Sequence, residues 1–297
     1  MYDVIIVGGG PAGLSAALVL GRSRRTVLLC DAGKQRNLWS DHMHGFLTRD
    51  GMPPCEFLEA ARAELVPYGV EQRRVVVKGA CKTDDHFTVT LVDGGELKSR
   101  RLLLATGVSD HIPKIAGIDE LYGKSVHHCP YCDGWENRDR RIAVYGKQNK
   151  GVGLALSMLT WSSDIVLCTD GPARMSARDR EQLKQHGIAT RKERIIRLEG
   201  EGSQLTKVIF ERGDTLHRDA LFFNTGQNQA CDLAQNFGCL FNNKGTVETN
   251  RFEGTNIPGL FVAGDASRDV QLVIVAAAEG AKAAIAINTS LQKEDLK

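Results

Sequence analysis

The chain has 297 residues, of which 42% are hydrophobic and 25% charged, the ordinary range of a folded globular protein rather than a disordered one. At about 150 residues per domain, this length predicts two domains. Its 38 lysines and arginines against 36 aspartates and glutamates leave a formal charge of +2, which is too balanced for a surface that binds nucleic acid or an anionic membrane.

The N-terminal segment predicts a strand, a glycine-rich turn and a helix in direct succession. Residues 4–7 read Val-Ile-Ile-Val, typical of a buried parallel strand, and apolar residues recur at helical spacing over 14–20. A second strand over 26–30 ends at Asp31 and completes a βαβ unit. The uncharged run 4–21 contains five glycines, so we interpret it as this unit rather than as a signal peptide or a membrane span.

The turn carries the spacing Gly-x-Gly-x-x-Gly at Gly8, Gly10 and Gly13. The first glycine allows a tight turn, the second lets the backbone approach a pyrophosphate, and the third packs the helix against the strand. The phosphate would then bind the free backbone N–H groups at the start of the helix. Asp31, at the end of the next strand, would accept a hydrogen bond from a ribose hydroxyl.

The same order of elements recurs in the middle of the chain. A strand at 141–145 precedes a turn at 146–151, a helix is expected at 153–161, and a strand at 164–168 leads to Asp170. Asp170 follows its turn at nearly the same distance as Asp31 follows the first turn. The sequence therefore predicts two nucleotide-binding-type units.

The remaining elements decide the domain organisation. Further strands are expected at 74–77, 87–92, 97–105, 208–211, 216–223 and 260–263, with a long alanine-rich helix from about 270 to 288. We place the boundaries near Pro113 and Thr246, which gives a first domain of 1–113 with 246–297 and a second of 114–245. The predicted fold class is α/β, with two dinucleotide-binding-type three-layer domains, the second inserted into the first.

The C-terminal Gly264-Asp265, between a strand and a long helix, favours a flavin over a nicotinamide in the first domain. An aspartate at this strand end can bind the ribitol chain. The helix beginning near Gln271 would direct its positive end at the flavin N1–C2 carbonyl, where reduced flavin gathers negative charge.

Cys129 and Cys132 form one close pair among eight cysteines; the other six lie apart at 30, 55, 81, 168, 231 and 239. This usage favours a reducing, cytoplasmic compartment and a disulfide between neighbouring turns, with Asp133 able to pass a proton to the leaving thiol. His127 and His128 raise zinc as an alternative, but structural zinc usually needs a second cysteine pair. Two inert core cysteines are the other alternative. We predict a redox disulfide and no metal site, with the histidines either tuning the thiols or lying on the surface.

Together these motifs resemble those of the low-molecular-weight thioredoxin reductase family over nearly the whole chain, at 8–13, 104–107, 129–134, 224–226 and 258–265. The resemblance implies an FAD domain in two segments, an inserted domain that carries the disulfide, and a homodimer. It also implies that Cys132 faces the flavin C4a, Cys129 attacks the substrate disulfide and Asp133 is the acid–base group. The FAD contacts that we predict are Gly8, Gly10, Pro11, Ala12, Gly13, Asp31, Ala105, Thr106, Gly107, Gly264, Asp265, Gln271 and Leu272.

The second glycine turn departs from the family pattern, which has a middle glycine and a basic His-Arg-Arg run for the NADPH 2′-phosphate. Here Gln148 replaces that glycine, and its side chain is expected in the path of the phosphate. Asp170 would repel a 2′-phosphate and at best hold the ribose of NADH. We therefore expect that NADPH is not used in the usual way, with NADH as a weak alternative. Pro130-Tyr131 also replaces the family's small residues and resembles the branch that includes dithiol oxidases, although that branch typically has histidine in place of Asp133.

Three functions stay open at this point. We predict an FAD-dependent disulfide oxidoreductase acting on a thioredoxin-like protein or a small disulfide or dithiol, reduced by an unidentified donor such as a ferredoxin-like protein. The first alternative is a dithiol oxidase that uses oxygen to form a disulfide in a small molecule. The second is a flavin-bound redox sensor without enzymatic activity, against which the intact Cys129, Cys132 and Asp133 argue. No nucleic-acid or membrane partner is expected.

Overall fold

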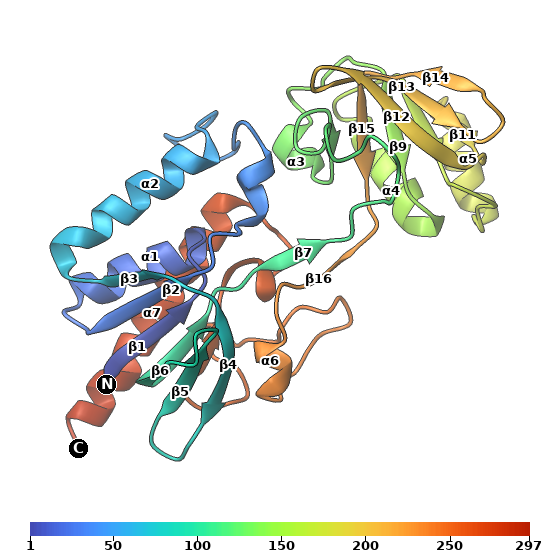
Figure 1. Cartoon of the computed structure of the whole chain (residues 1–297). Coiled ribbons are helices and arrows are strands. Elements are labelled where there is room, and N and C mark those ends of the chain that lie inside the picture. Colours follow the sequence, from blue (N-terminus) through green and yellow to red (C-terminus); the bar gives the residue numbers. More distant parts are fainter. The chain divides into compact units, whose positions relative to one another are not determined.

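The computed structural model describes all 297 residues apart from the side chains of Gln148 and Asn149, and it divides into two compact units (Figure 1). The first unit comprises Met1–Leu38, Gly45–Ser109 and Asn228–Lys297, and the second comprises Trp39–His44 and Asp110–Gln227. Each unit is built on a largely parallel sheet with both faces covered, which is the predicted three-layer α/β class. Two short strands, β7 (Val108–Asp110) and β16 (Gln227–Gln229), pair where the chain passes between the units.

Both main boundaries between the units differ from the predicted domain boundaries. The first unit stops at Ser109 rather than near Pro113, and it resumes at Asn228 rather than near Thr246. Packing explains the second difference, because Leu233 of the short helix α6 (Leu233–Asn236) lies in one buried cluster with strand residue Ile5. The passage of Trp39–His44 into the second unit was not predicted at all.

The first unit contains a seven-stranded sheet of order β3-β2-β1-β6-β5-β4, in which β17 also pairs with β6. Strands β3, β2, β1, β6 and β17 are parallel, whereas β4 and β5 join antiparallel. The strands are β1 (Tyr2–Val7), β2 (Val27–Asp31), β3 (Glu71–Arg74), β4 (Val77–Lys82), β5 (Phe87–Leu91), β6 (Glu96–Leu104) and β17 (Leu260–Val262). The main helices are α1 (Pro11–Arg22), α2 (Pro54–Leu65) and α7 (Val273–Asp295).

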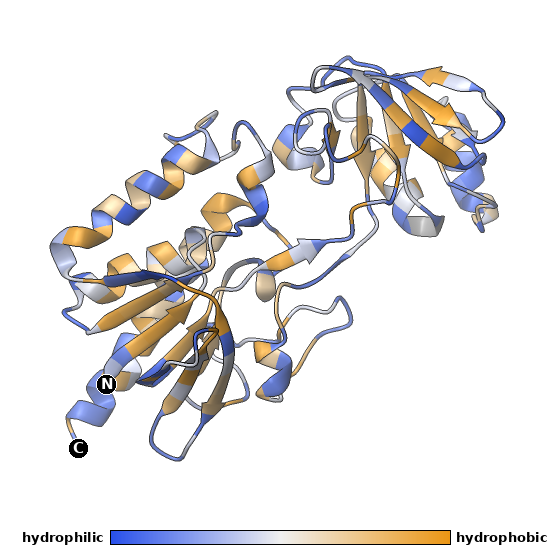
Figure 2. Cartoon of the chain, in the orientation of Figure 1, coloured by the Kyte–Doolittle hydropathy of each residue, from blue (hydrophilic) through white to orange (hydrophobic). Residues whose placement is uncertain are grey.

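Side chains of the central strand β1 alternate between two buried clusters. Ile6 packs with Leu20 of α1 and Ile287 of α7, whereas Ile5 packs with Leu28 on the opposite face. Because both faces of this strand are covered, it reads as a continuous apolar run rather than as an alternating one. Figure 2 shows orange stretches, which mark hydrophobic residues, along the strands of this sheet.

The second unit repeats this plan around a five-stranded parallel sheet of order β11-β10-β9-β15-β8. These strands are β8 (Val126–His127), β9 (Ile142–Tyr145), β10 (Ile165–Cys168), β11 (Ala189–Arg191) and β15 (Ala220–Phe223). Helices α4 (Gln148–Met158) and α5 (Ala177–Gln185) cover one face. An antiparallel sheet of β12 (Ile195–Glu201), β13 (Gln204–Phe210) and β14 (Thr215–His217) covers the other. Helix α3 (Pro130–Asp133) is a single turn that follows β8.

Two predicted strands are wrong in detail. Residues 75–76 connect β3, which ends at Arg74, to β4, which begins at Val77. Residues 216–223 form two strands because the chain leaves the antiparallel sheet and enters the parallel one. Helix α5 was not predicted, although Ser176 and Asp179 form a capping box, each side chain accepting from the other's backbone N–H. That pattern is visible in the sequence as Ser-x-x-Asp before a helix.

Helix α7 is long and apolar enough to cross a membrane on the grounds of length and composition alone. Its residues Ala283, Ala284 and Ile287 are fully buried in the cluster shared with α1. One face of α7 is therefore packed in the core of the first unit.

Helices α1 and α7 approach each other closely at Gly280. A Cβ atom on this residue would lie 2.0 Å from the backbone oxygen of Ala12, so only glycine allows the observed approach. Ala12 lies in the first turn of α1, directly after the glycine-rich turn. The contact therefore fixes the start of α1 against the last helix of the chain.

The substitution Gly280→Ala should destabilise the protein by about 1–3 kcal/mol, because α7 must move away from α1 to admit a methyl group. The midpoint of thermal unfolding, followed by far-ultraviolet circular dichroism, should fall by several degrees. Gly153→Ala in α4 is the matched control, because its Cβ would meet no described atom within 4 Å. The control should be neutral or slightly stabilising. Equal losses in both variants would contradict the packing explanation.

Candidate active site

The glycine-rich turn of the first unit is shaped by two backbone contacts. Gly8 has a φ of +117°, and a Cβ there would lie 2.1 Å from the oxygen of Ala105. A Cβ on Gly13 would lie 1.8 Å from the oxygen of Gly8. At Gly10, in contrast, a Cβ would meet no described atom within 4 Å, and among the described residues no side chain caps α1 there. The start of α1 thus has room at Gly10 and no side-chain cap among the described residues, which is compatible with an anion site.

Asp31 and the segment after β6 lie beside this turn, as the predicted FAD contacts require. A Cβ on Gly9 would lie 2.3 Å from Cγ of Asp31, and the N–H of Ala105 donates to the Val7 oxygen at 2.8 Å. The Asp31 carboxylate accepts from the Gly33 N–H at 2.8 Å and from Arg62 Nη2 at 2.9 Å. The structure thus brings these residues together, while their contact with a ligand stays a prediction.

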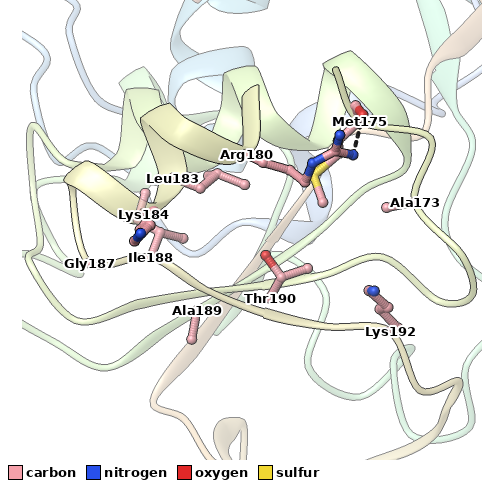
Figure 3. A pocket seen from close by; sticks show the side chains of 10 residues that line it. All are labelled: Ala173, Met175, Arg180, Leu183, Lys184, Gly187, Ile188, Ala189, Thr190 and Lys192. Carbon is pink, nitrogen blue, oxygen red and sulfur yellow. Dashed lines mark hydrogen bonds between the residues drawn. The ribbon is translucent and has the colours of Figure 1, made fainter. Parts of the chain in front are cut away.

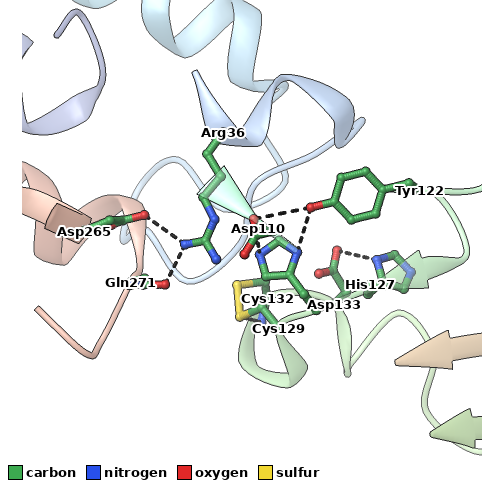
Figure 4. Close-up of a disulfide and its surroundings, with 10 residues drawn as sticks. Arg36, Asp110, Tyr122, His127, Cys129, Cys132, Asp133, Asp265 and Gln271 are labelled. Carbon is green, nitrogen blue, oxygen red and sulfur yellow. Dashed lines mark hydrogen bonds and ion pairs between the residues drawn. A yellow bond between two sulfur atoms is a disulfide. The ribbon is translucent and has the colours of Figure 1, made fainter. Parts of the chain in front are cut away.

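Arg36 joins two further predicted FAD contacts, Asp265 and Gln271 (Figure 4). Its Nη1 donates to Oδ2 of Asp265 at 3.0 Å and to Oε1 of Gln271 at 2.6 Å. Asp265 follows β17, and Leu272 is the N-cap of α7, where no described side chain caps the helix. Arg36 was missed because it belongs to no motif; the only sequence signal is its position shortly after the strand end at Asp31.

A buried polar atom beside Arg36 lacks a partner. The amide Nδ2 of Asn37, on the same 3₁₀ turn, is buried and makes no hydrogen bond to any described residue. Such a group normally has a partner because burying it unpaired is unfavourable. With the open space at Gly10 and the uncapped start of α7, it fits a site completed by a polar cofactor.

In the second unit, Cys129 and Cys132 form a disulfide with their Cα atoms 5.3 Å apart (Figure 4). Cys129 is the N-cap of α3, and its Sγ accepts from the backbone N–H of Cys132 at 3.2 Å. Pro130 occupies the first helical position, where its missing N–H and fixed φ are favourable. Tyr131 is 76% exposed and packs edge-on against Trp161, with ring centroids 5.5 Å apart.

Two side chains, those of His127 and Asn137, contact Asp133, the residue after Cys132. Its Oδ1 lies 3.3 Å from Nδ1 of His127, which is buried rather than on the surface. Asn137 Nδ2 donates to the backbone oxygen of Asp133 at 2.8 Å. His128 turns to different partners, with Nδ1 3.1 Å from the Tyr122 hydroxyl.

The second glycine turn keeps the packing contact of the first. A Cβ on Gly151 would lie 2.2 Å from the oxygen of Gly146, as Gly13 lies against Gly8. Helix α4, however, already begins at Gln148, the position that corresponds to the open Gly10. The predicted obstruction by the Gln148 side chain lies outside the described residues.

The carboxylate of Asp170 is contacted by three groups of the second unit. It accepts from the Tyr145 hydroxyl at 3.1 Å and from the Ile195 N–H at 3.2 Å, and Lys147 Nζ lies 3.6 Å away. Burial, the Asp170 charge and this hydrogen bond raise the pKa of Tyr145 to about 12. Tyr145 therefore stays a hydrogen-bond donor to Asp170 throughout the physiological range.

A cavity of about 460 Å³ also opens in the second unit (Figure 3). Its lining comes from α5, from β11, from the residues on either side of β11 and from the loop before α5, with Arg180, Lys184 and Lys192 as its cations. The disulfide and the second glycine turn belong to other elements of this unit, so neither contributes to the cavity.

The remaining cysteines differ in exposure. Burial raises the pKa of Cys30 to about 11 and that of Cys168 to about 12. Cys55 and Cys81 are exposed free thiols. Because the thiolate is the reacting form of a cysteine, Cys30 and Cys168 should be chemically inert.

Alkylation of the native protein by iodoacetamide at pH 8 should therefore label Cys55 and Cys81, while Cys30 and Cys168 react only after unfolding. A pKa of about 11 lowers the thiolate fraction of Cys30 on the order of a hundredfold relative to an ordinary thiol. Peptide mass spectrometry of timed samples measures each rate, with a urea-unfolded sample as the control. Labelling of Cys30 as fast as Cys81 would show that the first sheet opens readily.

Comparison with known proteins agrees with this arrangement. The family model described as pyridine nucleotide-disulphide oxidoreductase matches residues 2–280. The chain is 31% identical to a protein of Arthroderma benhamiae named "Probable thioredoxin reductase", over 99% of this chain and 81% of that protein.

Two solved structures are also similar. The structure of HlmI is 38% identical with a TM-score of 0.95, covering 99% of this chain and 94% of that one. An oxidoreductase from Agrobacterium tumefaciens is 33% identical with a TM-score of 0.91, covering 98% of each chain. The chain therefore belongs to the pyridine nucleotide-disulphide oxidoreductase family and is a thioredoxin reductase-like, FAD-dependent disulfide oxidoreductase.

Proposed function

We propose that electrons pass between FAD in the first unit, the Cys129–Cys132 pair and the disulfide of a thioredoxin-type protein or small molecule, with a donor other than NADPH. The observation that carries this proposal is the disulfide at the start of α3, with the carboxyl group of Asp133 on the next residue. A disulfide oxidoreductase needs such a pair and a group that exchanges protons with the leaving sulfur.

The first unit would hold FAD through residues already in place. Bound FAD supplies a two-electron carrier. The N–H groups beyond Gly10 would bind its pyrophosphate, Asp31 would accept from the ribose, and Asp265 would bind the ribitol chain. Asn37 Nδ2 would gain the partner that it otherwise lacks.

At the disulfide, Cys129 is proposed to attack the substrate and Cys132 to face the flavin. The backbone N–H of Cys132 that donates to Cys129 Sγ would also stabilise a thiolate at that sulfur. Asp133 would give a proton to the departing thiol.

The proposed exclusion of NADPH rests on the second glycine turn. Asp170 stands at the strand end where an NADPH site needs cationic groups, and Tyr145 and the Ile195 N–H hold it there. A carboxylate at this point repels a 2′-phosphate. The helix also starts at Gln148, where a glycine would otherwise admit the pyrophosphate.

An anaerobic reduction series tests the donor and the direction of electron flow. Flavin absorbance is followed with NADPH, NADH, reduced ferredoxin and a dithiol such as dithiothreitol, and dithionite gives the fully reduced end point. We expect little bleaching by NADPH; rapid full bleaching at micromolar NADPH would contradict the proposal. Dithiol-driven bleaching followed by oxygen uptake, abolished in Cys129→Ser, would indicate a dithiol oxidase instead.

Substituting Cys129→Ser should leave Cys132 as a thiolate beside oxidised flavin, which produces a long-wavelength charge-transfer band. Absorbance spectra across a pH series measure it, and Cys132→Ser serves as the control that lacks the band. If Cys129→Ser shows no band at any pH, the flavin-facing cysteine has been assigned wrongly.

The substitution Arg36→Met should weaken FAD binding tenfold or more, because it removes the cation that holds Asp265 and Gln271. Equilibrium dialysis of FAD against the apoprotein gives the dissociation constant. Arg49→Met is the matched control, since Arg49 is exposed and donates to the oxygen of its neighbour Thr48 at 3.4 Å. Unchanged affinity in Arg36→Met would remove Arg36 from the site.

A further inference from the structure

We propose that His127 is a positioning residue that fixes the Asp133 carboxyl group for proton transfer to the sulfur that leaves during disulfide exchange. The proposal rests on the proposed function, in which Asp133 is the acid–base group. It assigns a role to a histidine whose purpose the sequence leaves open.

Three residues near the disulfide, His127, Asp133 and Asn137, contact one another. Figure 4 shows the first two. His127 ends β8, and its Nδ1 lies 3.3 Å from Oδ1 of Asp133. Its Nε2 lies 3.4 Å from Nδ2 of Asn137. The same Asn137 Nδ2 donates to the backbone oxygen of Asp133 at 2.8 Å.

These contacts determine where the imidazole carries its proton. The amide of Asn137 must present its NH₂ group, because its oxygen would face the Asp133 carbonyl oxygen if the amide were turned round. An NH₂ group only donates, so Nε2 of His127 is the acceptor. The hydrogen of the neutral ring is then on Nδ1, directed at Oδ1 of Asp133.

Burial makes this orientation rigid. His127 is 4% exposed and Asn137 is 3% exposed, and the imidazole packs on the ring of Phe222 with centroids 5.1 Å apart. A polar side chain at such a place is favourable only with its hydrogen bonds made. Asn137 secures the backbone of Asp133, whereas His127 contacts Oδ1 of its carboxyl group. The proposal assigns the other oxygen, Oδ2, to proton exchange with the reacting sulfur.

The exchange needs only the reduced enzyme, the substrate disulfide and water. The Cys129 thiolate attacks the substrate disulfide, a Cys129–substrate disulfide forms, and the departing thiolate takes the proton of the Asp133 carboxyl group. The carboxylate then accepts the proton of the Cys132 thiol. Cys132 attacks Cys129 Sγ, the enzyme disulfide closes, and the second substrate thiolate leaves and takes its proton from water. Two electrons have passed from the enzyme dithiol to the substrate.

The test uses two disulfides whose leaving thiols differ in acidity. Glutathione disulfide releases an ordinary thiol that needs a proton, whereas 5,5′-dithiobis(2-nitrobenzoate) releases a stable thiolate that does not. The FAD-loaded enzyme is reduced anaerobically with dithiothreitol, freed of excess reagent and mixed with each disulfide. Acid quenching, alkylation and mass spectrometry of Cys129 and Cys132 then give the rate of disulfide formation.

His127→Phe should slow the reaction with glutathione disulfide by about tenfold to a hundredfold. It should slow the reaction with 5,5′-dithiobis(2-nitrobenzoate) by less than about threefold. His127→Asn should recover most of the rate, because its amide N–H takes the place of Nδ1–H. His128→Phe is the matched control, one residue along, and should leave both rates unchanged. If His127→Phe does not fold or bind FAD, His127→Gln replaces it, because its amide reaches the position of Nε2 but not that of Nδ1.

A loss of equal size with both disulfides, a loss shared by His128→Phe, or an unchanged rate with glutathione disulfide would overturn the proposal. In the double variant with Asp133→Asn, the His127→Phe change should cost nothing further. Asp133→Asn also separates the two proposals. If it leaves both rates unchanged, the proposed function fails at its acid–base group; if it slows exchange while His127→Phe does not, only the role of His127 is lost.

Discussion

The contact of a helix with the strand before it, backbone against backbone, is the constraint on which both units depend. In the first unit Gly13 packs on the oxygen of Gly8, and in the second Gly151 packs on the oxygen of Gly146. No side chain fits between these atoms, so each helix starts close to the end of its strand. The same contact also explains why glycine stays at Gly146 and Gly151 whether or not a nucleotide binds there.

This constraint gathers the chemistry at one edge of each parallel sheet. In the first unit Asp31, Ala105 and Asp265 all follow strands that run in the same direction, so their ends meet around the start of α1. In the second unit Asp170 takes the place of Asp31 by the same geometry. The two copies differ in what surrounds those ends: open space at Gly10, but the first helical residue at Gln148. The shared fold thus carries two glycine turns that differ at this position.

The sequence predicted what depends on local pattern and failed where distant contacts decide. Apolar runs and glycine spacing identified β1 and α1, and the close spacing of Cys129 and Cys132 identified the disulfide, because each has a strong local signal. The return to the first unit at Asn228 depends on Leu233 packing against the sheet. The residue composition around Asn228 does not mark this boundary. Arg36 was likewise not predicted, because its partner Asp265 lies far along the chain. For His127 the sequence left a surface position open, whereas the fold buries it against Phe222 of the distant strand β15.

The short passage Trp39–His44 has a consequence for how the chain can be divided. It lies with the second unit, where a Cβ on Gly123 would lie 2.4 Å from the Trp39 oxygen and where Lys124 pairs with Asp41. The chain therefore crosses between the units four times rather than twice. A fragment cut at the two main crossings, 110–227, would lack a piece of its own surface, and the complementary fragment would carry a loop with nothing to rest on. Each unit is compact in the structure, but neither is formed by one continuous segment of the sequence.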